Sequence, residues 1–430
     1  MKASYYNTII RDNGLSYWFN ALSFSHFILD TKLSEKIEGL LDTPEEIKDN
    51  APLFYDRLVD YGFLIPDDLD ELALIRERNE KAINWKLYKL TIIPTLNCNY
   101  KCWYCIQDHI PSIMSDETMA KIKRHIAYMI DVEGIEGLHI EWFGGEPFMF
   151  YDRIMKPLSL YAKKLCAEKG IPFTNGSTTN GYFINEKVAG ELDDLCLHHF
   201  QITLDGNREF HDKVKFQNGC ESTFDYVLGN IDRMMRNSDR IQLTLRINYT
   251  HDNLSNDIVG EVSLRLSPEI RKRITILPRK VWQKEVDRSY VNELYRILDL
   301  FEEMGFRVER WSPIRNYIPC YASRKYYNSI NYNGHLLKCT ASDDMYREEP
   351  MGYLEEDGSI HWNGDFGTAY QCKSFENERC LACRRLPVCM GQCPRNHLAG
   401  ITDCCYDLTD ETFEAALLDY LRHEHKVTKQ

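Results

Sequence analysis

The sequence has no uninterrupted apolar run long enough to cross a membrane, and it has no excess of basic residues. Its 430 residues include 52 Lys and Arg against 65 Asp and Glu, which gives a formal net charge of −13. A membrane span needs roughly 20 consecutive apolar residues, and a protein that binds nucleic-acid phosphates needs a basic surface. We therefore expect neither a membrane protein nor one whose main partner is a nucleic acid.

The first residues also lack a secretory signal. Met1–Tyr5 begins the chain with no apolar core and no small-residue cleavage site after it. We therefore expect a cytoplasmic protein, in a compartment where thiols stay reduced and disulfides are rare. The 15 cysteines then need another role, and cytosolic cysteines at short spacings usually bind metal.

Most of the cysteines fall into two groups. Three lie between Cys98 and Cys105, and nine lie between Cys320 and Cys405. A buried apolar side chain is the expectation for the isolated ones. These isolated cysteines are Cys166, Cys196 and Cys220.

Residues 1–80 carry strand patterns followed by helical ones. Tyr5–Arg11 and Leu15–Leu29 read as strands joined by a turn at Asp12–Gly14. Short amphipathic helices are expected over Thr31–Leu41 and Ala51–Tyr61. This order predicts a small winged-helix-like domain. Nine Lys and Arg against sixteen Asp and Glu in residues 1–81 disfavour DNA binding by it.

From about residue 86, strand patterns alternate with helical ones. Such alternation favours parallel strands joined by helical crossovers. Six units predict an α/β domain, a partial (β/α)6 barrel over residues 86–311, with its chemistry at the C-terminal ends of the strands. The expected strands are Leu87–Pro94, Leu138–Phe143, Pro172–Thr178, Phe200–Leu204, Gln242–Tyr249 and Ile274–Leu277.

The periodic pattern fades over residues 312–430, where cysteine-rich loops dominate until a last helix at Asp410–His423. A segment with so little regular structure needs a metal centre to hold it together. We therefore expect a third, cysteine-rich domain.

The first cysteine group has the pattern C-x3-C-x2-C, formed by Cys98, Cys102 and Cys105. Three thiolates on one tight loop can bind three irons of a [4Fe–4S] cluster and leave the fourth iron an exchangeable position. The alternative is a structural zinc loop with His109 as the fourth ligand.

With an aromatic residue before its last cysteine, this pattern resembles the signature of the radical S-adenosylmethionine (SAM) superfamily. The resemblance implies a cluster whose open iron chelates SAM. It also implies reductive cleavage to a 5′-deoxyadenosyl radical that abstracts hydrogen, and an electron donor such as flavodoxin or ferredoxin. No residue is assigned as a general base.

Segments at the other strand ends resemble SAM-lining parts of the same family. Glycines let the backbone approach a ligand closely, and a carboxylate can accept a hydrogen bond from the SAM ammonium group. Ordinary turn chemistry is the alternative for any one of them. The implied SAM-binding residues are Tyr104, Gly144, Gly145, Glu146, Pro147, Thr179, Asn180, Thr203, Asp205 and Arg246, with Asn248 as a further candidate.

The segment Asp205–Asp212 resembles a family stretch that is often followed by Arg. Here Lys213 and Lys215 stand nearby instead. The role of this loop therefore stays open.

The spacing of the second cysteine group closely resembles the SPASM domain found after some radical SAM barrels. The resemblance implies two auxiliary iron–sulfur clusters, expected to be [4Fe–4S]. Either Cys372 completes the first cluster or one of its irons is open, and paired zinc ribbons are the alternative. The implied ligands are Cys320, Cys339 and Cys393 for the first cluster, and Cys380, Cys383, Cys389 and Cys404 for the second, with Cys405 as an alternative last ligand.

Proteins of this combined kind mostly act on peptides. We therefore expect an enzyme that installs a thioether or carbon–carbon cross-link in a ribosomally made precursor peptide, whose leader residues 1–80 would bind as an added strand. The alternative for residues 1–80 is a domain that serves only for dimerisation or for packing. A sulfatase-maturing oxidase is a rival function, disfavoured because Thr340 stands where those enzymes carry a catalytic Asp. A non-catalytic metal-bound scaffold is a rival of another class.

Overall fold

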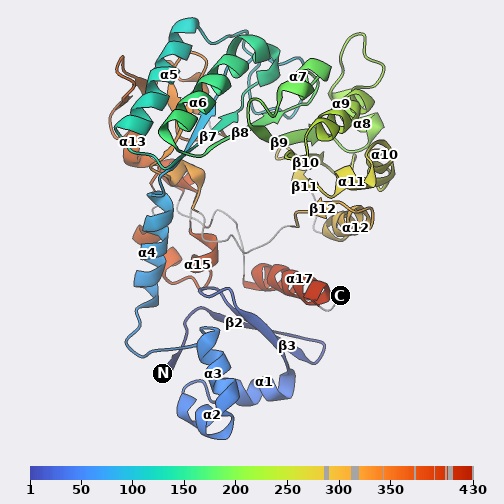
Figure 1. Cartoon of the computed structure of the whole chain (residues 1–430). Coiled ribbons are helices and arrows are strands. Elements are labelled where there is room, and N and C mark those ends of the chain that lie inside the picture. The colour runs from blue at the N-terminus through green and yellow to red at the C-terminus, as the bar shows by residue number, and fades with distance from the viewer. Residues whose placement is uncertain are drawn as a thin grey trace. The chain divides into compact units, whose positions relative to one another are not determined.

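The computed structural model describes residues 1–284, 290–310, 319–341, 343–371, 374–391, 393–401, 404 and 410–428. The chain divides into two compact units (Figure 1). We call Lys86–Arg310 with Tyr326–Gly367 the barrel unit, and Met1–Trp85 with Trp311–Lys325 and Thr368–Gln430 the terminal unit.

The barrel unit is built on a nine-stranded sheet with the order β12-β11-β10-β9-β8-β7-β6-β13-β14. The neighbours from β12 to β13 pair in parallel, and β14 pairs antiparallel with β13. All six predicted strands are confirmed, as β6 to β11. The strands are β6 (Leu87–Ile92), β7 (Gly137–Trp142), β8 (Phe173–Thr179), β9 (Leu197–Leu204), β10 (Gln242–Tyr249), β11 (Ile274–Lys280), β12 (Arg307–Val308), β13 (Tyr327–Ile330) and β14 (Leu336–Leu337).

Helices connect these strands and cover one face of the sheet (Figure 1). The sheet with its crossovers is the α/β architecture that the strand–helix alternation predicts. The longer helices are α5 (Asp116–Asp131), α6 (Lys156–Lys169), α9 (Thr223–Asn237), α10 (Asp257–Arg265) and α12 (Tyr290–Glu303). The shorter ones are η1 (Pro147–Phe150), η2 (Tyr151–Met155), α7 (Glu186–Glu191), α8 (Arg208–Val214), α11 (Pro268–Arg271) and η4 (Asp343–Tyr346).

The two faces of the sheet differ in chemistry because successive side chains of a strand point to opposite faces. On β7, Leu138, Ile140 and Trp142 are fully buried in the core beneath the helices. His139 and Glu141 alternate with them, are partly exposed, and so lie on the other, inner face. The inner face is therefore polar, and it is not packed like the interior of a closed barrel.

The barrel unit also contains a small antiparallel hairpin, β15 (Gly352–Leu354) with β16 (Ile360–Trp362). Helix α13 (Phe366–Ala369) follows at the point where the chain passes into the terminal unit.

The terminal unit begins with a three-stranded antiparallel sheet of order β2-β3-β4. The predicted turn is confirmed, with Asn13 and Gly14 at φ values of +47° and +78° that suit a tight hairpin. The first elements are β1 (Lys2–Ala3), β2 (Asn7–Asp12), β3 (Leu15–Asn20), β4 (His26–Asp30), α1 (Thr31–Glu38), α2 (Pro44–Asn50), α3 (Pro52–Asp60), β5 (Leu64–Ile65) and α4 (Glu71–Ile83).

The cysteine-rich part of the terminal unit consists of short helices and one long one. The last helix is confirmed, although it runs five residues further than the predicted end at His423. The elements are η3 (Tyr321–Ser323), η5 (Ser374–Glu376), α14 (Glu378–Leu381), α15 (Leu386–Cys389), α16 (Pro394–Leu398) and α17 (Asp410–Thr428).

Both ends of the chain share one core in the terminal unit. Tyr17 and Phe19 of β3 pack in a cluster with Val388 and with Leu417 of α17. The other face of the same strand places Trp18 in a second core beneath α1 and α3. The residues before and after the barrel therefore share a core and belong to one compact unit. The winged-helix likeness stays a prediction.

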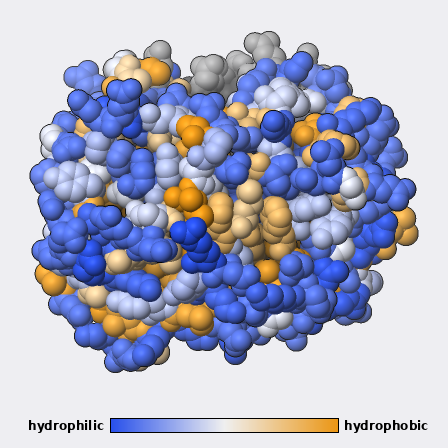
Figure 2. All heavy atoms as spheres, turned by 90° about the horizontal axis from the view of Figure 1, so that it is seen from above, coloured by the Kyte–Doolittle hydropathy of each residue, from blue (hydrophilic) through white to orange (hydrophobic). Residues whose placement is uncertain are grey.

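Charged and polar side chains cover most of the face of the molecule that Figure 2 shows from above, and hydrophobic residues lie in groups among them. Among the helices of the described residues, none is both long and apolar enough to span a membrane.

Candidate functional site

The glycine turn after β7 lies directly against the chain that leads into the first cysteine group. The amide of Gly145 donates to the carbonyl of Thr95 (3.1 Å), and that of Glu146 donates to the carbonyl of Asn97 (2.9 Å). A Cβ on Gly145 would lie 2.1 Å from the Asn97 carbonyl oxygen, and Gly144 has a φ of +124°. Both positions therefore require glycine, and the turn holds the start of the cysteine loop.

Glu146 is fully buried, and its carboxylate is surrounded by protein donors. It accepts hydrogen bonds from Thr179 Oγ1 (2.8 Å), the Asn180 amide (2.8 Å) and the Phe148 amide (3.0 Å). Burial raises the pKa of this carboxyl group to about 7, against the lowering effect of these donors. The side chain thus links the end of β7 to the end of β8, and Pro147 beside it opens the short helix η1.

The three cysteines lie on the loop between β6 and α5, at the C-terminal end of the strand. Active sites of barrels of this kind lie at the C-terminal ends of their strands. The Cys98 sulfur receives hydrogen bonds from the Tyr100 amide (3.4 Å) and from Asn180 Nδ2 (3.8 Å). Burial raises the pKa of Cys98 to about 12, and burial also raises the pKa of Cys102 and Cys105.

The donor chemistry of this loop fits an iron–sulfur cluster. All three cysteines carry free thiols, and thiolates with amide hydrogen bonds to their sulfurs are the usual ligands of such clusters. Within the described ranges, no three His, Cys, Asp or Glu side chains are arranged to hold a single metal ion. A cubane instead takes each thiolate at a separate corner.

Tyr104, between the second and third cysteines, reaches the segments that follow β9 and β11. Its hydroxyl donates to Asp205 Oδ1 (2.6 Å), and its carbonyl accepts from Gln283 Nε2 (2.8 Å). Lys215 pairs with Asp205 Oδ2 (2.8 Å) and also donates to the carbonyl of Thr203 (3.1 Å). The structure thus brings three of the expected SAM-binding residues into one network.

Arg246 projects from β10 beside this network. Its Nε donates to Asn248 Oδ1 (2.8 Å), and Asn248 Nδ2 in turn donates to Asp205 Oδ1 (3.2 Å). Burial lowers the pKa of the Arg246 guanidinium, and the nearby Arg279 lowers it further. All the expected SAM-binding residues therefore lie at the C-terminal ends of β6 to β10 or in the loops that follow them.

Sequence reasoning missed a charged cluster on the inner face of the sheet. Glu141 Oε2 lies 3.2 Å from His139 Nε2 and 3.4 Å from Lys89 Nζ, and Thr178 Oγ1 donates to Glu141 Oε1 (3.4 Å). Burial raises the pKa of Glu141, but its His139 and Lys89 partners outweigh it and the net shift is downward. The signal was present as charged residues that alternate with apolar ones in β6 and β7.

The second cysteine group lies almost entirely in the terminal unit, on or beside its short helices. The Cys383 amide donates to the carbonyl of Cys380 (3.1 Å) across a single turn. Cys339 follows β14 in the barrel unit and is buried. Cys372 and Cys405, considered as ligands above, lie outside the described residues. The described members in the terminal unit are Cys320, Cys380, Cys383, Cys389, Cys393 and Cys404, and all carry free thiols.

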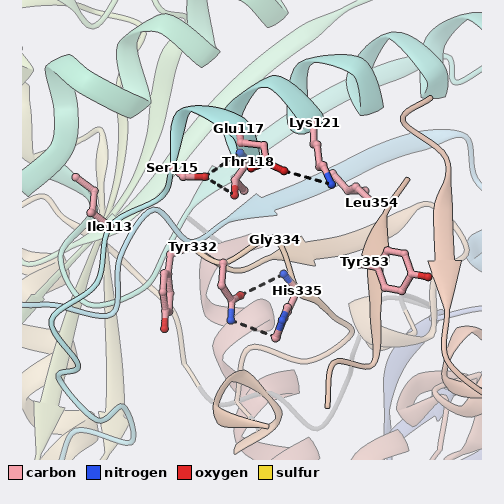
Figure 3. Close-up of a pocket in the computed structure, with 11 residues that line it drawn as sticks. Ile113, Ser115, Glu117, Thr118, Lys121, Tyr332, Gly334, His335, Tyr353 and Leu354 are labelled. Atoms are coloured by element: carbon pink, nitrogen blue, oxygen red, sulfur yellow. Dashed lines mark hydrogen bonds and ion pairs between the residues drawn. The ribbon is translucent and has the colours of Figure 1, made fainter. Parts of the chain in front are cut away.

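A separate pocket of about 430 Å³ opens beside the first turns of α5. Figure 3 shows Lys121 and Glu117 of this helix on one side and the turn that carries His335 on the other. Lys121 is already paired with Glu117 (3.8 Å) and Glu356 (2.9 Å). Among the residues that the structure describes, no cysteine lines this pocket, so it is distinct from the cysteine loop.

The chain is similar to known proteins in sequence and in fold. Residues 92–253 match the model of the Radical SAM superfamily. The chain is 22% identical, over 81% of its length and 76% of the relative's, to the radical SAM cyclopropyl synthase TigE of Paramaledivibacter caminithermalis.

Two solved structures share the fold. The structure of Streptococcus suis SuiB bound to its precursor peptide SuiA aligns over 94% of this chain and 97% of that one, with a TM-score of 0.53 and 16% identity. Native anSMEcpe with bound AdoMet aligns over 71% and 88%, with a TM-score of 0.51 and 18% identity. Residues 92–253, from the end of β6 through β10 with the cysteine loop and the glycine turn, are therefore a radical SAM domain.

Proposed function

We propose that this protein is a radical SAM enzyme that abstracts hydrogen from a ribosomally made precursor peptide and installs a thioether or carbon–carbon cross-link. The observation that carries the proposal is the loop of Cys98, Cys102 and Cys105, held by the Gly144–Pro147 turn at the C-terminal edge of the sheet. A [4Fe–4S] cluster held there would supply reductive SAM cleavage to a 5′-deoxyadenosyl radical.

The residues of this chain would bind and orient SAM. The glycine backbone at Gly144 and Gly145 offers polar groups close to the loop, and the guanidinium of Arg246 suits a carboxylate. The carboxylates of Glu146 and Asp205 accept hydrogen bonds from protein donors, so we assign them to the support of the site. Tyr104, Thr179, Asn180 and Thr203 complete the proposed SAM surroundings.

The cysteine spacing in residues 312–430 supports two auxiliary iron–sulfur clusters that would hold substrate or accept an electron. Thiolates are the ligands that such clusters require. Their proposed ligands are the cysteines named for them above, and the fourth ligand of the first cluster is not assigned.

One structural relative supports a peptide substrate, because SuiB has been solved with its precursor peptide SuiA. We propose that the leader of such a peptide adds a strand to an edge of the β2-β3-β4 sheet, where backbone groups at a sheet edge can pair with an extended chain. We also propose a cytoplasmic location, which keeps the cysteines reduced, and flavodoxin or ferredoxin as electron donor.

The test is anaerobic incubation of the reconstituted protein with SAM, a reductant and the precursor peptide encoded beside its gene. A cross-link formed by loss of hydrogen lowers the peptide mass by about 2 Da for each bond, and tandem mass spectrometry locates it. The Cys98→Ala, Cys102→Ala, Cys105→Ala variant is the control and should give no product. An unchanged peptide mass, with 5′-deoxyadenosine formed at the same rate with and without peptide, would contradict the proposal.

A sulfatase-maturing oxidase is the second candidate, because such enzymes share the combination of a radical SAM barrel and a cysteine-rich C-terminal region that the sequence resembles. Thr340 argues against it because a hydroxyl is too weak a base for the role of a carboxylate at neutral pH. Conversion of a sulfatase-type Cys peptide to formylglycine would establish it. Zinc without sulfide in the purified protein would instead favour the non-catalytic scaffold.

A further inference from the structure

A buried ion pair lies directly behind the cysteine loop. Lys215 Nζ and Asp205 Oδ2 are 2.8 Å apart, and their side chains are only 4% and 1% exposed. Removing two charges from water costs several kcal/mol per ion unless each has further hydrogen bonds. The further hydrogen bonds of Lys215 and Asp205 therefore indicate the role of the pair.

The pair's further hydrogen bonds lead to the cysteine loop. Asp205 Oδ1 accepts a 2.6 Å hydrogen bond from the Tyr104 hydroxyl, between residues 101 positions apart in the chain. Tyr104 stands between Cys102 and Cys105. A short hydrogen bond to an ionised carboxylate is one of the stronger kinds, so Asp205 restrains the ring, and with it the backbone between two cysteines.

Lys215 is itself held in place from several sides. Its Nζ donates to the Thr203 carbonyl (3.1 Å), and its own carbonyl accepts from Thr223 Oγ1 (2.7 Å) at the start of α9. The Asp205 amide donates to the Nδ1 atom of His211, which is fully buried. The network is thus anchored in β9, α8 and α9, and Tyr104 connects it to the cysteine loop.

We propose that Asp205 and Lys215 are a positioning pair that sets the conformation of the Cys102–Cys105 segment through the Tyr104 hydroxyl. The cluster-binding role of that segment rests on the proposed function, and the positioning role goes beyond it. The pair explains why Asp205 is buried although it stands where a ligand contact was expected. It also gives Lys215 a role that its exposed neighbour Lys213 does not share.

The chain supplies a matched control for this proposal. Lys213 stands two positions from Lys215 and pairs with Glu209 at 2.6 Å, but the two side chains are 63% and 68% exposed. Such exposed pairs contribute little to stability. Lys213→Met therefore removes the same charge from the same segment without touching the network, whereas Lys215→Met leaves the Asp205 carboxylate buried without its cation.

The experiment measures the cluster and SAM binding without any peptide substrate. Reconstituted Lys215→Met, Tyr104→Phe and Lys213→Met proteins are compared with the parent by iron content, by the electron paramagnetic resonance (EPR) spectrum of the reduced cluster with and without SAM, and by SAM affinity. In the Lys215→Met and Tyr104→Phe proteins we expect an altered SAM-induced spectral change and SAM affinity weaker by roughly tenfold or more. Lys213→Met should match the parent in iron content, EPR spectrum and SAM affinity. Lys215→Arg should keep most of the parent's SAM affinity and SAM-induced spectral change.

Tyr104→Phe keeps the test decisive if Lys215→Met fails to fold, because it removes one hydroxyl and leaves the ion pair intact. The proposal is overturned if folded Tyr104→Phe and Lys215→Met proteins both keep the parent's iron content, spectra and SAM affinity. It is also overturned if Lys213→Met changes them as strongly. Failure of the peptide reaction alone would leave these readouts unaffected, so the two proposals fail separately.

Discussion

Gly145 has no room for a side chain, and this can be tested directly. A Cβ there would lie 2.1 Å from the Asn97 carbonyl oxygen and 2.6 Å from that of Leu96, and both are backbone atoms that cannot turn aside. Gly145→Ala should therefore displace the chain leading into Cys98, cost on the order of 2 kcal/mol or more in the free energy of unfolding, and lower cluster occupancy. Denaturant unfolding and iron analysis measure the two effects.

A second glycine is the control for this prediction. Gly229 lies inside α9, where, apart from its chain neighbours and the backbone of its own helix, no atom of the described residues comes within 4 Å of the position that a Cβ would take. Gly229→Ala should be neutral or stabilise the protein by about 0.5–1 kcal/mol, because alanine loses less backbone entropy in a helix. Equal losses in both variants would refute a steric role for Gly145.

At the scale of elements, His125 links helix α5 to the β15–β16 hairpin and to β6. Its Nδ1 lies 2.7 Å from the Gly358 carbonyl, so Nδ1 must donate, and Nε2 therefore accepts from the Tyr88 hydroxyl at 2.6 Å. Full burial lowers the pKa of this imidazole from 6.5 to about 4. The neutral form is thus the one that joins the three elements.

This shift predicts how stability depends on pH. Between pH 6.5 and pH 4 the unfolded His125 binds a proton that the folded one does not, so stability falls as pH falls through this window, by about 3 kcal/mol in all. The loss should be absent from His125→Gln. Thermal or denaturant unfolding of both proteins at pH 7 and pH 5 measures it. A pH dependence that is the same in the two proteins would contradict the assignment.

Comparison of the two proteins also removes the opposite contribution of Glu146. Burial raises the pKa of that carboxyl from 4.5 to about 7, so the folded protein binds the extra proton there and stability falls as pH rises between these values. Because Glu146 is present in both proteins, their difference isolates His125.

At the scale of the whole molecule, the terminal unit joins residues from both ends of the chain in one core. Phe19 of β3 is 1% exposed, and Leu417 of α17 in the same cluster is fully buried. Phe19→Ala should cost about 3–5 kcal/mol and speed amide hydrogen exchange in α17 as well as in β2–β4. Exchange in β6–β11 should not change, because those strands belong to the other unit.

Leu33→Ala in α1 is the matched control, since Leu33 is 48% exposed and should alter exchange little. If Phe19→Ala affected only the first 30 residues, a core shared by the two ends would be ruled out.

The metal content of the whole chain gives a further prediction. Three [4Fe–4S] clusters would hold about 12 irons per chain, and the triple alanine variant of Cys98, Cys102 and Cys105 should lose about 4 of them. Iron and sulfide analysis after anaerobic reconstitution measures both values. The EPR signal of the remaining clusters should no longer respond to SAM in the variant. A variant that keeps all of the parent's iron would argue against a cluster on this loop.

Much of the fold could be predicted because it is encoded in local periodicity. The alternation Leu138, Ile140, Trp142 identifies a strand with one buried face, and the strand–helix alternation predicts the crossover helices that the structure contains. Likewise the cysteine spacing of the first loop and the two glycines after β7 could be recognised from neighbouring residues alone.

The partners of individual polar side chains could not be predicted in this way. Glu146 and Asp205 were expected to contact SAM, and Glu141 was passed over. Their hydrogen bonds come from Thr179, Lys215 and His139, and only the packing of different strands brings such groups together.

The sequence by itself therefore determined the strand and helix order of the barrel unit and the cysteine loop with its glycine turn, because these depend on residues close together in the chain. Only the tertiary structure decided that Asp205 supports Tyr104 and Lys215, and that the two ends of the chain share a core. Those contacts join residues up to several hundred positions apart. Burial selects among them because a charge removed from water is unfavourable unless an opposite charge or hydrogen bonds compensate it.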